Sequence, residues 1–345
     1  MRGKRTVETG AVRMVDVAAR AGVSQTTASR VLSGFKNVSP ETRAAVNQAA
    51  EALGYEVNLA ARSLASSRSQ SIGFVVAEPS AHVWGGTYFP RLLQGITEAT
   101  EGSRLQLAIF MRQPDQTSKR LRRYLTQGHV DGLLLITSTR RDPLLLDLLN
   151  HDMPVVVGGR PLGVTDASYV DVDNFRGAQV ATKHLIEKGY RHPAHIAGPT
   201  DTAAGEDRLG GYMYAMKEAG IEPVVWRAKD FSYQEGAAGA AYILNRHPVT
   251  DAFFAAGDVL GLGAMTAITN AGRGIPDDVG IIGFDDSEPA SAALPSMSSM
   301  FQSVEQLGKE MVRLLLDRIM EPQQPPLQSI LGTRLVERES SKGPS

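Results

Sequence analysis

The chain has 345 residues, of which 42% are hydrophobic and 21% charged, so it has a globular composition and enough length for a small module plus a larger unit. It contains no cysteine, which excludes disulfides, cysteine-zinc sites and thiol catalysis. No apolar run reaches the roughly 18 residues of a transmembrane helix, and no apolar segment follows the first positive charges, so we expect a cytoplasmic protein without a secretory signal.

Charge is distributed unevenly along the chain, although the net value is only −1. Residues 1–68 carry ten Lys and Arg against five Asp and Glu, whereas the remaining residues carry an excess of six negative charges. A basic head on an acidic body indicates a polyanion-binding module joined to a unit that does not bind polyanions. Residues 1–11 are polar and aperiodic, and we expect them to form a disordered tail.

Two short helices joined by a tight turn are predicted between Met14 and Gly34. The first has an apolar face at helical spacing, formed by Met14, Val17, Ala18 and Ala21. Gly22 then breaks the pattern where a positive φ is easily adopted, and Ser24 is expected to cap the second helix. Its outer face carries side chains that suit major-groove edges: Gln25, Thr26, Ser29 and Arg30. This is the helix-turn-helix pattern, with a solvated helical hairpin as the alternative.

A third helix completes this module, which we assign to residues 12–57. It opens with Ser39 as N-cap and Pro40 at the first helical position, and it ends at Gly54. Its buried face is predicted to contain Val46, Ala49, Ala50 and Leu53. Residues 58–70 follow; their composition indicates a linker with some helical propensity.

From residue 71 onwards, continuous apolar strands alternate with amphipathic helices. The first series has strands at 72–77, 105–110, 130–136 and 154–159, with helices at 88–101, 115–127 and 143–150. The second has strands at 169–173, 194–198, 224–228, 251–257 and 279–286, with helices at 175–188, 207–219, 233–245 and 260–271. A last helix at 304–320 and a final strand near 327–337 follow.

This alternation of strands and helices predicts the α/β class, with two doubly wound parallel sheets forming two lobes. We assign residues 71–171 and 301–326 to the first lobe, 172–300 and 327–338 to the second, and 339–345 to a tail. Ligands of such sheets bind beyond the carboxyl ends of the strands, which between two lobes becomes a cleft.

From about Val12 to Arg338 the sequence resembles the lactose-repressor/galactose-repressor (LacI) family of bacterial transcription regulators. The segments that carry the resemblance are DVAARAGVSQTTASRVLSG, VSPETRAAVNQAAEALGYEVN, ARSLASSRSQSIGFVV, DRLGGYMYAM, AAGDVLGLGAMTAI and IPDDVGIIGFDD. The resemblance implies a homodimer that binds pseudo-palindromic operator DNA, most often as a repressor. It also implies a body similar to periplasmic sugar-binding proteins, with a small-molecule effector between the lobes.

The resemblance assigns DNA contacts to two segments. Gln25, Thr26, Ser29 and Arg30 match the recognition-helix positions that contact operator bases. Positions from Ala61 to Leu64 match a hinge helix that folds only when two subunits occupy an operator. Leu64 matches the leucine that enters the minor groove, where an apolar wedge unstacks a base step and kinks the duplex.

Effector contacts are assigned in the same way, to Tyr88, Phe89, Arg208, Phe231, Asp285 and Gln302. Each assigned residue type also has an ordinary structural role in folded proteins: apolar core, helix-end ion pair, packed strand end or helix cap. Two departures from the family pattern bear on the effector. Gly257 replaces a common Asn and removes one hydrogen-bonding group. Thr202 stands where the purine repressor has an additional arginine, which favours a sugar over a nucleobase.

Two other functional classes compete with this hypothesis. A solute-binding protein without DNA function is opposed by the basic helical head. An enzyme is opposed by the lack of GxGxxG, GxxxxGK[ST], HExxH and GxSxG motifs, and its histidines lack metal-ligand spacing. We therefore expect no catalysis, no cofactor, no metal and no membrane partner.

Overall fold

The computed structural model describes residues 12–32, 37–55, 69–77, 86–103, 105–112, 119–137 and 140–344. The chain divides into a helical unit, residues 1–69, and a two-lobed unit, residues 70–345. The predicted tail at 1–11 and the hinge positions Ala61 and Leu64 lie outside the described residues. Within the described residues, no helix has the length and hydropathy needed to cross a membrane.

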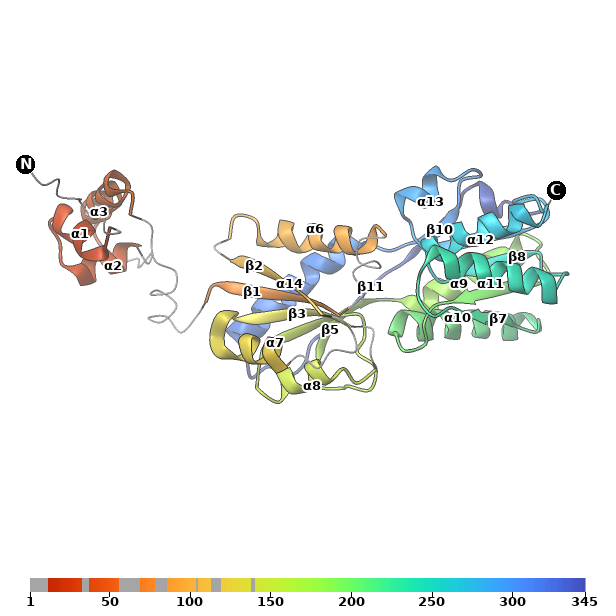
Figure 1. Ribbon diagram of the computed structural model, residues 1–345, viewed down its shortest axis with the longest axis horizontal. Coiled ribbons are helices and arrows are strands. Elements are labelled where there is room, and N and C mark those ends of the chain that lie inside the picture. Colours follow the sequence, from red (N-terminus) through yellow and green to blue (C-terminus); the bar gives the residue numbers. More distant parts are fainter. Residues whose placement is uncertain are drawn as a thin grey trace, which may run out of the picture. The chain divides into compact units, whose positions relative to one another are not determined.

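The helical unit confirms the predicted helix-turn-helix and its third helix. It consists of α1 (Met14–Arg20), α2 (Gln25–Leu32) and α3 (Pro40–Leu53), shown in red and brown in Figure 1. Ser24 Oγ accepts the Thr27 N–H at 3.1 Å, and Ser39 Oγ accepts the Thr42 N–H at 3.3 Å, so both predicted caps form. The small core contains Val17, Ala18, Ala28, Val31, Val46, Ala49 and Ala50.

The first lobe is a six-stranded parallel sheet covered on both faces. Its strands, in spatial order, are β11 (Gln328–Leu331), β5 (Ser168–Val172), β4 (Val155–Gly158), β3 (Gly132–Thr137), β1 (Ser71–Ala77) and β2 (Gln106–Met111). One face packs on α6 (Tyr88–Thr100) and α14 (Val304–Met320), and the other on α7 (Lys119–Tyr124), a π-helical turn (Leu125–His129) and α8 (Pro143–Leu149) (Figure 1). Alternate strand residues face opposite ways: Phe74 belongs to the core cluster that contains Leu92, whereas Val75 belongs to the cluster that contains Leu144.

The second lobe repeats this plan. Its strands, in spatial order, are β12 (Arg334–Val336), β10 (Ser298–Phe301), β9 (Gly280–Asp285), β8 (Ala252–Ala255), β6 (Pro193–Ala197) and β7 (Val224–Arg227). Helices α9 (Asn174–Glu187) and α10 (Ala203–Ala219) cover one face, while α11 (Tyr233–Arg246) and α12 (Asp258–Asn270) cover the other. A short helix, α13 (Glu288–Ala292), follows β9. Only β12 pairs antiparallel to its neighbour, among the strands that the structure describes.

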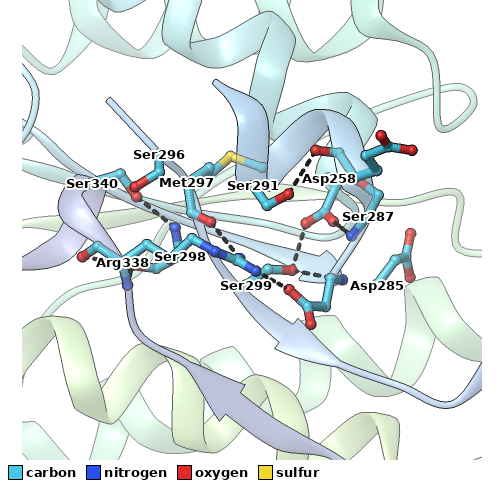
Figure 2. Close-up of polar contacts among 12 residues, drawn as sticks. Asp258, Asp285, Ser287, Ser291, Ser296, Met297, Ser298, Ser299, Arg338 and Ser340 are labelled. Carbon is cyan, nitrogen blue, oxygen red and sulfur yellow. Dashed lines mark hydrogen bonds and ion pairs between the residues drawn. The ribbon is translucent and has the colours of Figure 1, made fainter. Parts of the chain in front are cut away.

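The carboxyl-terminal segment corrects two predictions. Instead of one final strand in the second lobe, β11 pairs with β5 of the first sheet, and β12 pairs with β10 of the second. Residues 332 and 333 separate the two strands, so the chain crosses between the lobes there. The predicted tail is also wrong at Ser340 and Ser341, which are fully buried. Ser340 Oγ accepts the Ser298 N–H at 2.8 Å (Figure 2). It also donates to the Ile281 carbonyl at 2.6 Å.

Some helix boundaries differ from the prediction. Helix α10 begins at Ala203, four residues before the predicted start, because Thr202 Oγ1 accepts the Gly205 N–H at 3.0 Å. Helix α12 begins at Asp258 instead of residue 260. The predicted helix at 115–127 is described only from Lys119, and it changes to a π-helical turn at Leu125.

Replacing Ser340 by Ala is expected to destabilise the two-lobed unit by about 1–3 kcal/mol, because two buried backbone groups lose their partner. Urea denaturation of the full chain measures the change in the free energy of unfolding. Lys342→Ala, at an exposed position two residues away, is the matched control. Equal stability of the two variants would contradict a structural role for this segment.

Candidate functional site

The predicted effector residues lie near the carboxyl ends of the strands, around the end of β9. Asp285 is the last residue of β9, and Gln302 follows β10. Asp285 and Asp286 have φ values of 114° and 52°, which are uncommon for residues with a side chain. Two consecutive residues in this region require surrounding contacts that hold them there.

Asp285 is held by residues from both lobes and from the segment between them. Gln302, which is 2% exposed, donates from Nε2 to Asp285 Oδ1 at 2.5 Å. Arg91, on α6 of the first lobe, donates from Nη1 to the Asp285 carbonyl at 3.1 Å. The Arg91 guanidinium is fixed by a bidentate ion pair with Glu305, at 2.7 and 3.1 Å. Gly95 allows this pair to form, because a Cβ there would lie 2.0 Å from the Glu305 carbonyl oxygen of α14.

Arg208 is positioned by neutral acceptors and an aromatic ring. It is 4% exposed on α10, donates from Nε to Asn174 Oδ1 at 2.8 Å, and donates from Nη1 to the Ala256 carbonyl at 2.5 Å. Its Cζ lies 3.5 Å from the centroid of the Phe284 ring. Burial lowers the pKa of Arg208, and the Asp285 carboxylate opposes that shift. The Nη1–Oδ1 separation of 3.8 Å from Asp285 is longer than a hydrogen bond, so both groups retain capacity for a ligand.

Aromatic side chains border these polar groups. Phe231 follows β7, and a Cβ at Gly257 would lie 3.3 Å from its ring and 3.8 Å from Asp285 Oδ2. Tyr88 and Phe89 form an edge-to-face pair at the start of α6, with ring centroids 5.4 Å apart. Tyr88 also interacts electrostatically with Arg208. All three rings are half-buried. The structure thus brings the six predicted residues into one neighbourhood.

A second carboxylate lies beneath the site. Asp258, at the start of α12, is buried; it accepts the Ser299 hydroxyl and the Ser287 N–H, both at 2.6 Å (Figure 2). Burial, followed by repulsion from Asp285, raises the pKa of Asp258 to about 7. Burial also raises the pKa of Asp285, against the opposing effects of Arg208 and Gln302.

The candidate DNA-binding residues lie on α2 of the helical unit. Gln25, Thr26 and Arg30 are exposed, whereas Ser29 is half-buried. A helix that presents amide, hydroxyl and guanidinium groups while Ala28 and Val31 face the core has the chemistry of a major-groove reader.

Comparison with known proteins identifies the family. The family model "Bacterial regulatory proteins, lacI family" matches residues 13–58, and the model "Periplasmic binding protein-like domain" matches residues 182–341. The "HTH-type transcriptional regulator CelR" of Thermobifida fusca is 42% identical over 328 residues, covering 94% of this chain and 96% of the relative. The chain belongs to the lacI family.

Solved structures agree with this lacI-family assignment over nearly the full length. A "transcriptional regulator CelR-cellobiose complex" matches with a TM-score of 0.76 and 40% identity, covering 95% of this chain and 99% of that one. The lac repressor dimer bound to operator and the anti-inducer ONPF matches with a TM-score of 0.84 and 25% identity, covering 96% and 99%. The protein is a transcriptional regulator of this family.

Three residues of the regulator's site were not predicted. Asn174 and Asp171 form a buried chain to Arg208, since Asn174 Nδ2 donates to Asp171 Oδ1 at 3.0 Å. Arg91 lies three residues after Tyr88 and therefore on a neighbouring part of the same helical surface. Two sequence signals could have indicated these residues. Arg91 is spaced three residues from Tyr88, and Asn174 lies just beyond the end of a strand.

The raised pKa of Asp258 predicts that the regulator loses stability as the pH rises. The folded state retains a proton that the unfolded chain releases above pH 3.8, so this stabilisation is complete below 3.8 and is lost as the pH rises through about 7. We expect Asp258→Asn to flatten the fall in unfolding free energy over this window, measured by urea denaturation at several pH values. Glu222→Gln, at an exposed carboxylate, should keep the wild-type slope; a wild-type slope in Asp258→Asn would argue against the assignment.

Proposed function

We propose that this regulator is a homodimeric repressor whose affinity for operator DNA is controlled by a sugar bound between its two lobes. The observation that carries the proposal is the placement of Arg208 and Asp285, a donor and an acceptor held by other partners and bordered by aromatic rings. The effector response is a coupling free energy of roughly 1–3 kcal/mol between cleft and operator.

A sugar suits this site chemically. Its hydroxyls accept from the guanidinium fork and donate to the carboxylate, while its apolar face stacks on a ring such as that of Phe231. The likeness to the CelR–cellobiose complex supports a disaccharide of glucose, and we propose cellobiose or a close relative as the effector.

Operator binding is supported by the exposed groups of α2 and by the likeness to the lac repressor dimer on its operator. Gln25, Thr26, Ser29 and Arg30 are proposed to contact base edges, and Ala61 and Leu64 to act in the hinge. The competing class, a solute-binding protein without DNA function, shares the two-lobed fold. Sequence-specific DNA binding by the full chain distinguishes the two.

Asp285→Ala is expected to abolish effector binding while sparing operator binding, because it removes the acceptor beside Arg208. A ligand that binds only the folded state raises the melting temperature, so cellobiose should stabilise the wild type and the surface control Glu222→Ala but not Asp285→Ala. Nucleobases serve as the second ligand class. A shift with nucleobases alone would overturn the sugar assignment, and an equal cellobiose shift in all three proteins would remove Asp285 from the site.

Arg30→Ala is expected to cost roughly 1–3 kcal/mol on an operator selected with the wild type, because an arginine that reads a base edge contributes about this much. Cellobiose binding should not change, since the residue lies in the helical unit. Fluorescence anisotropy on the selected operator and on random DNA measures the effect. Equal losses on both DNAs would mean that Arg30 contacts only the backbone.

A further inference from the structure

A pocket lined by several polar side chains lies beside the candidate effector site. It has a volume of about 360 Å³, within the range of small-molecule sites. Its first-lobe wall is formed by Thr87, Pro90, Arg91 and Gln94, and its second-lobe wall by Asp286 and Glu288. We call it the mouth pocket.

The mouth pocket shares a wall with the effector site. Arg91, which lines the pocket, donates to the Asp285 carbonyl at 3.1 Å, and Asp286 directly follows Asp285 in the chain. Gly86 also lines the pocket, and a Cβ there would lie 3.8 Å from Val259, the residue after Asp258. The mouth pocket therefore adjoins the residues that hold Asp285, on the side of α6.

Two of the lining side chains have fixed positions. Arg91 is held by Glu305. Asp286 accepts from Arg338 Nη2 at 2.6 Å, and its N–H donates to the Ser299 hydroxyl at 3.0 Å. Asp286 thus keeps its position despite a φ of 52°. These contacts neutralise the charges of Arg91 and Asp286 without occupying the second carboxylate oxygen of Asp286.

The remaining lining groups suit a neutral hydroxyl-rich ligand. Gln94 is exposed one helical turn beyond Pro90 and Arg91. Its Nε2 donates to Glu98 Oε1 at 2.8 Å, which leaves one amide N–H and the amide oxygen for a ligand. Glu288 has an exposed carboxylate, which accepts hydrogen bonds from hydroxyls and repels anions. Thr87 adds a hydroxyl, and the Pro90 ring adds an apolar surface.

We propose that the mouth pocket binds a second sugar unit of the effector, so that the regulator is selective for neutral di- and oligosaccharides over monosaccharides and sugar phosphates. The proposal rests on the proposed function, a sugar effector in the adjoining site. Because α6 and the segment after β9 belong to different lobes, the second unit contacts both lobes.

The test is isothermal titration calorimetry of the full-length protein with cellobiose and with glucose. The double variant Gln94→Ala/Glu288→Gln changes two exposed side chains that lie outside the Arg208–Asp285 pair. We expect the wild type to prefer cellobiose over glucose and the double variant to bind cellobiose about tenfold more weakly, as the loss of a hydrogen bond to a charged group implies. Glucose affinity should be unchanged, and the control Glu222→Gln should match the wild type for both sugars.

The outcomes separate this proposal from the one it rests on. If the double variant binds cellobiose as tightly as the wild type, while Asp285→Ala does not bind it, the mouth pocket is not a subsite and the sugar assignment stands. If the double variant loses affinity for glucose and cellobiose equally, the side chains support the main site and the proposal is wrong. If the wild type binds neither sugar, the proposed function fails as well.

Discussion

The site depends on the backbone at the end of β9, where two consecutive aspartates adopt positive φ. Such conformations cost of order 1–3 kcal/mol each and persist only where the surroundings impose them. Here the Asp285 carbonyl accepts from Arg91, its carboxylate accepts from Gln302, and the Asp286 N–H donates to Ser299. These partners come from the first lobe, the crossover segment and β10 of the second lobe. The position of the Asp285 carboxylate therefore depends on how the two lobes are placed relative to each other.

The buried charge of Arg208 favours an additional hydrogen-bond acceptor at this site. Arg208 is almost inaccessible, and its nearest hydrogen-bond partners are neutral, so its charge is incompletely compensated. In the proposed function, a sugar hydroxyl between Arg208 and Asp285 would be an additional acceptor for that guanidinium. The two lobes also meet through ion pairs of Arg140 with Glu206 and Arg160 with Asp207, just before Arg208 on α10. These pairs are partly exposed and therefore weak, which suits contacts that exchange when the lobes rearrange.

Much of the fold follows from local sequence. Most strands of the two sheets are largely apolar, because a strand covered on both faces buries nearly every side chain. Helix α14 has the predicted bounds because its amphipathic period is regular. Strands β11 (Gln-Ser-Ile-Leu) and β12 (Arg-Leu-Val) are too short to show a clear pattern, so their placement depends on the partners β5 and β10. Likewise the resemblance indicated Arg208 and Asp285, whereas Arg91 and Asn174 act on them through contacts between residues distant in sequence.

The proposed role of the mouth pocket connects this geometry with the class of effector that we propose for the regulator. A ligand shifts a conformational equilibrium only through contacts that differ between the two states. A monosaccharide would contact Arg208 and Asp285 of the second lobe and, in the first lobe, the aromatic pair Tyr88 and Phe89. A disaccharide extending to Gln94 on α6 and Glu288 on α13 would add contacts to both lobes at once. Recognition of a longer sugar and control of the lobes would then depend on the same hydrogen bonds.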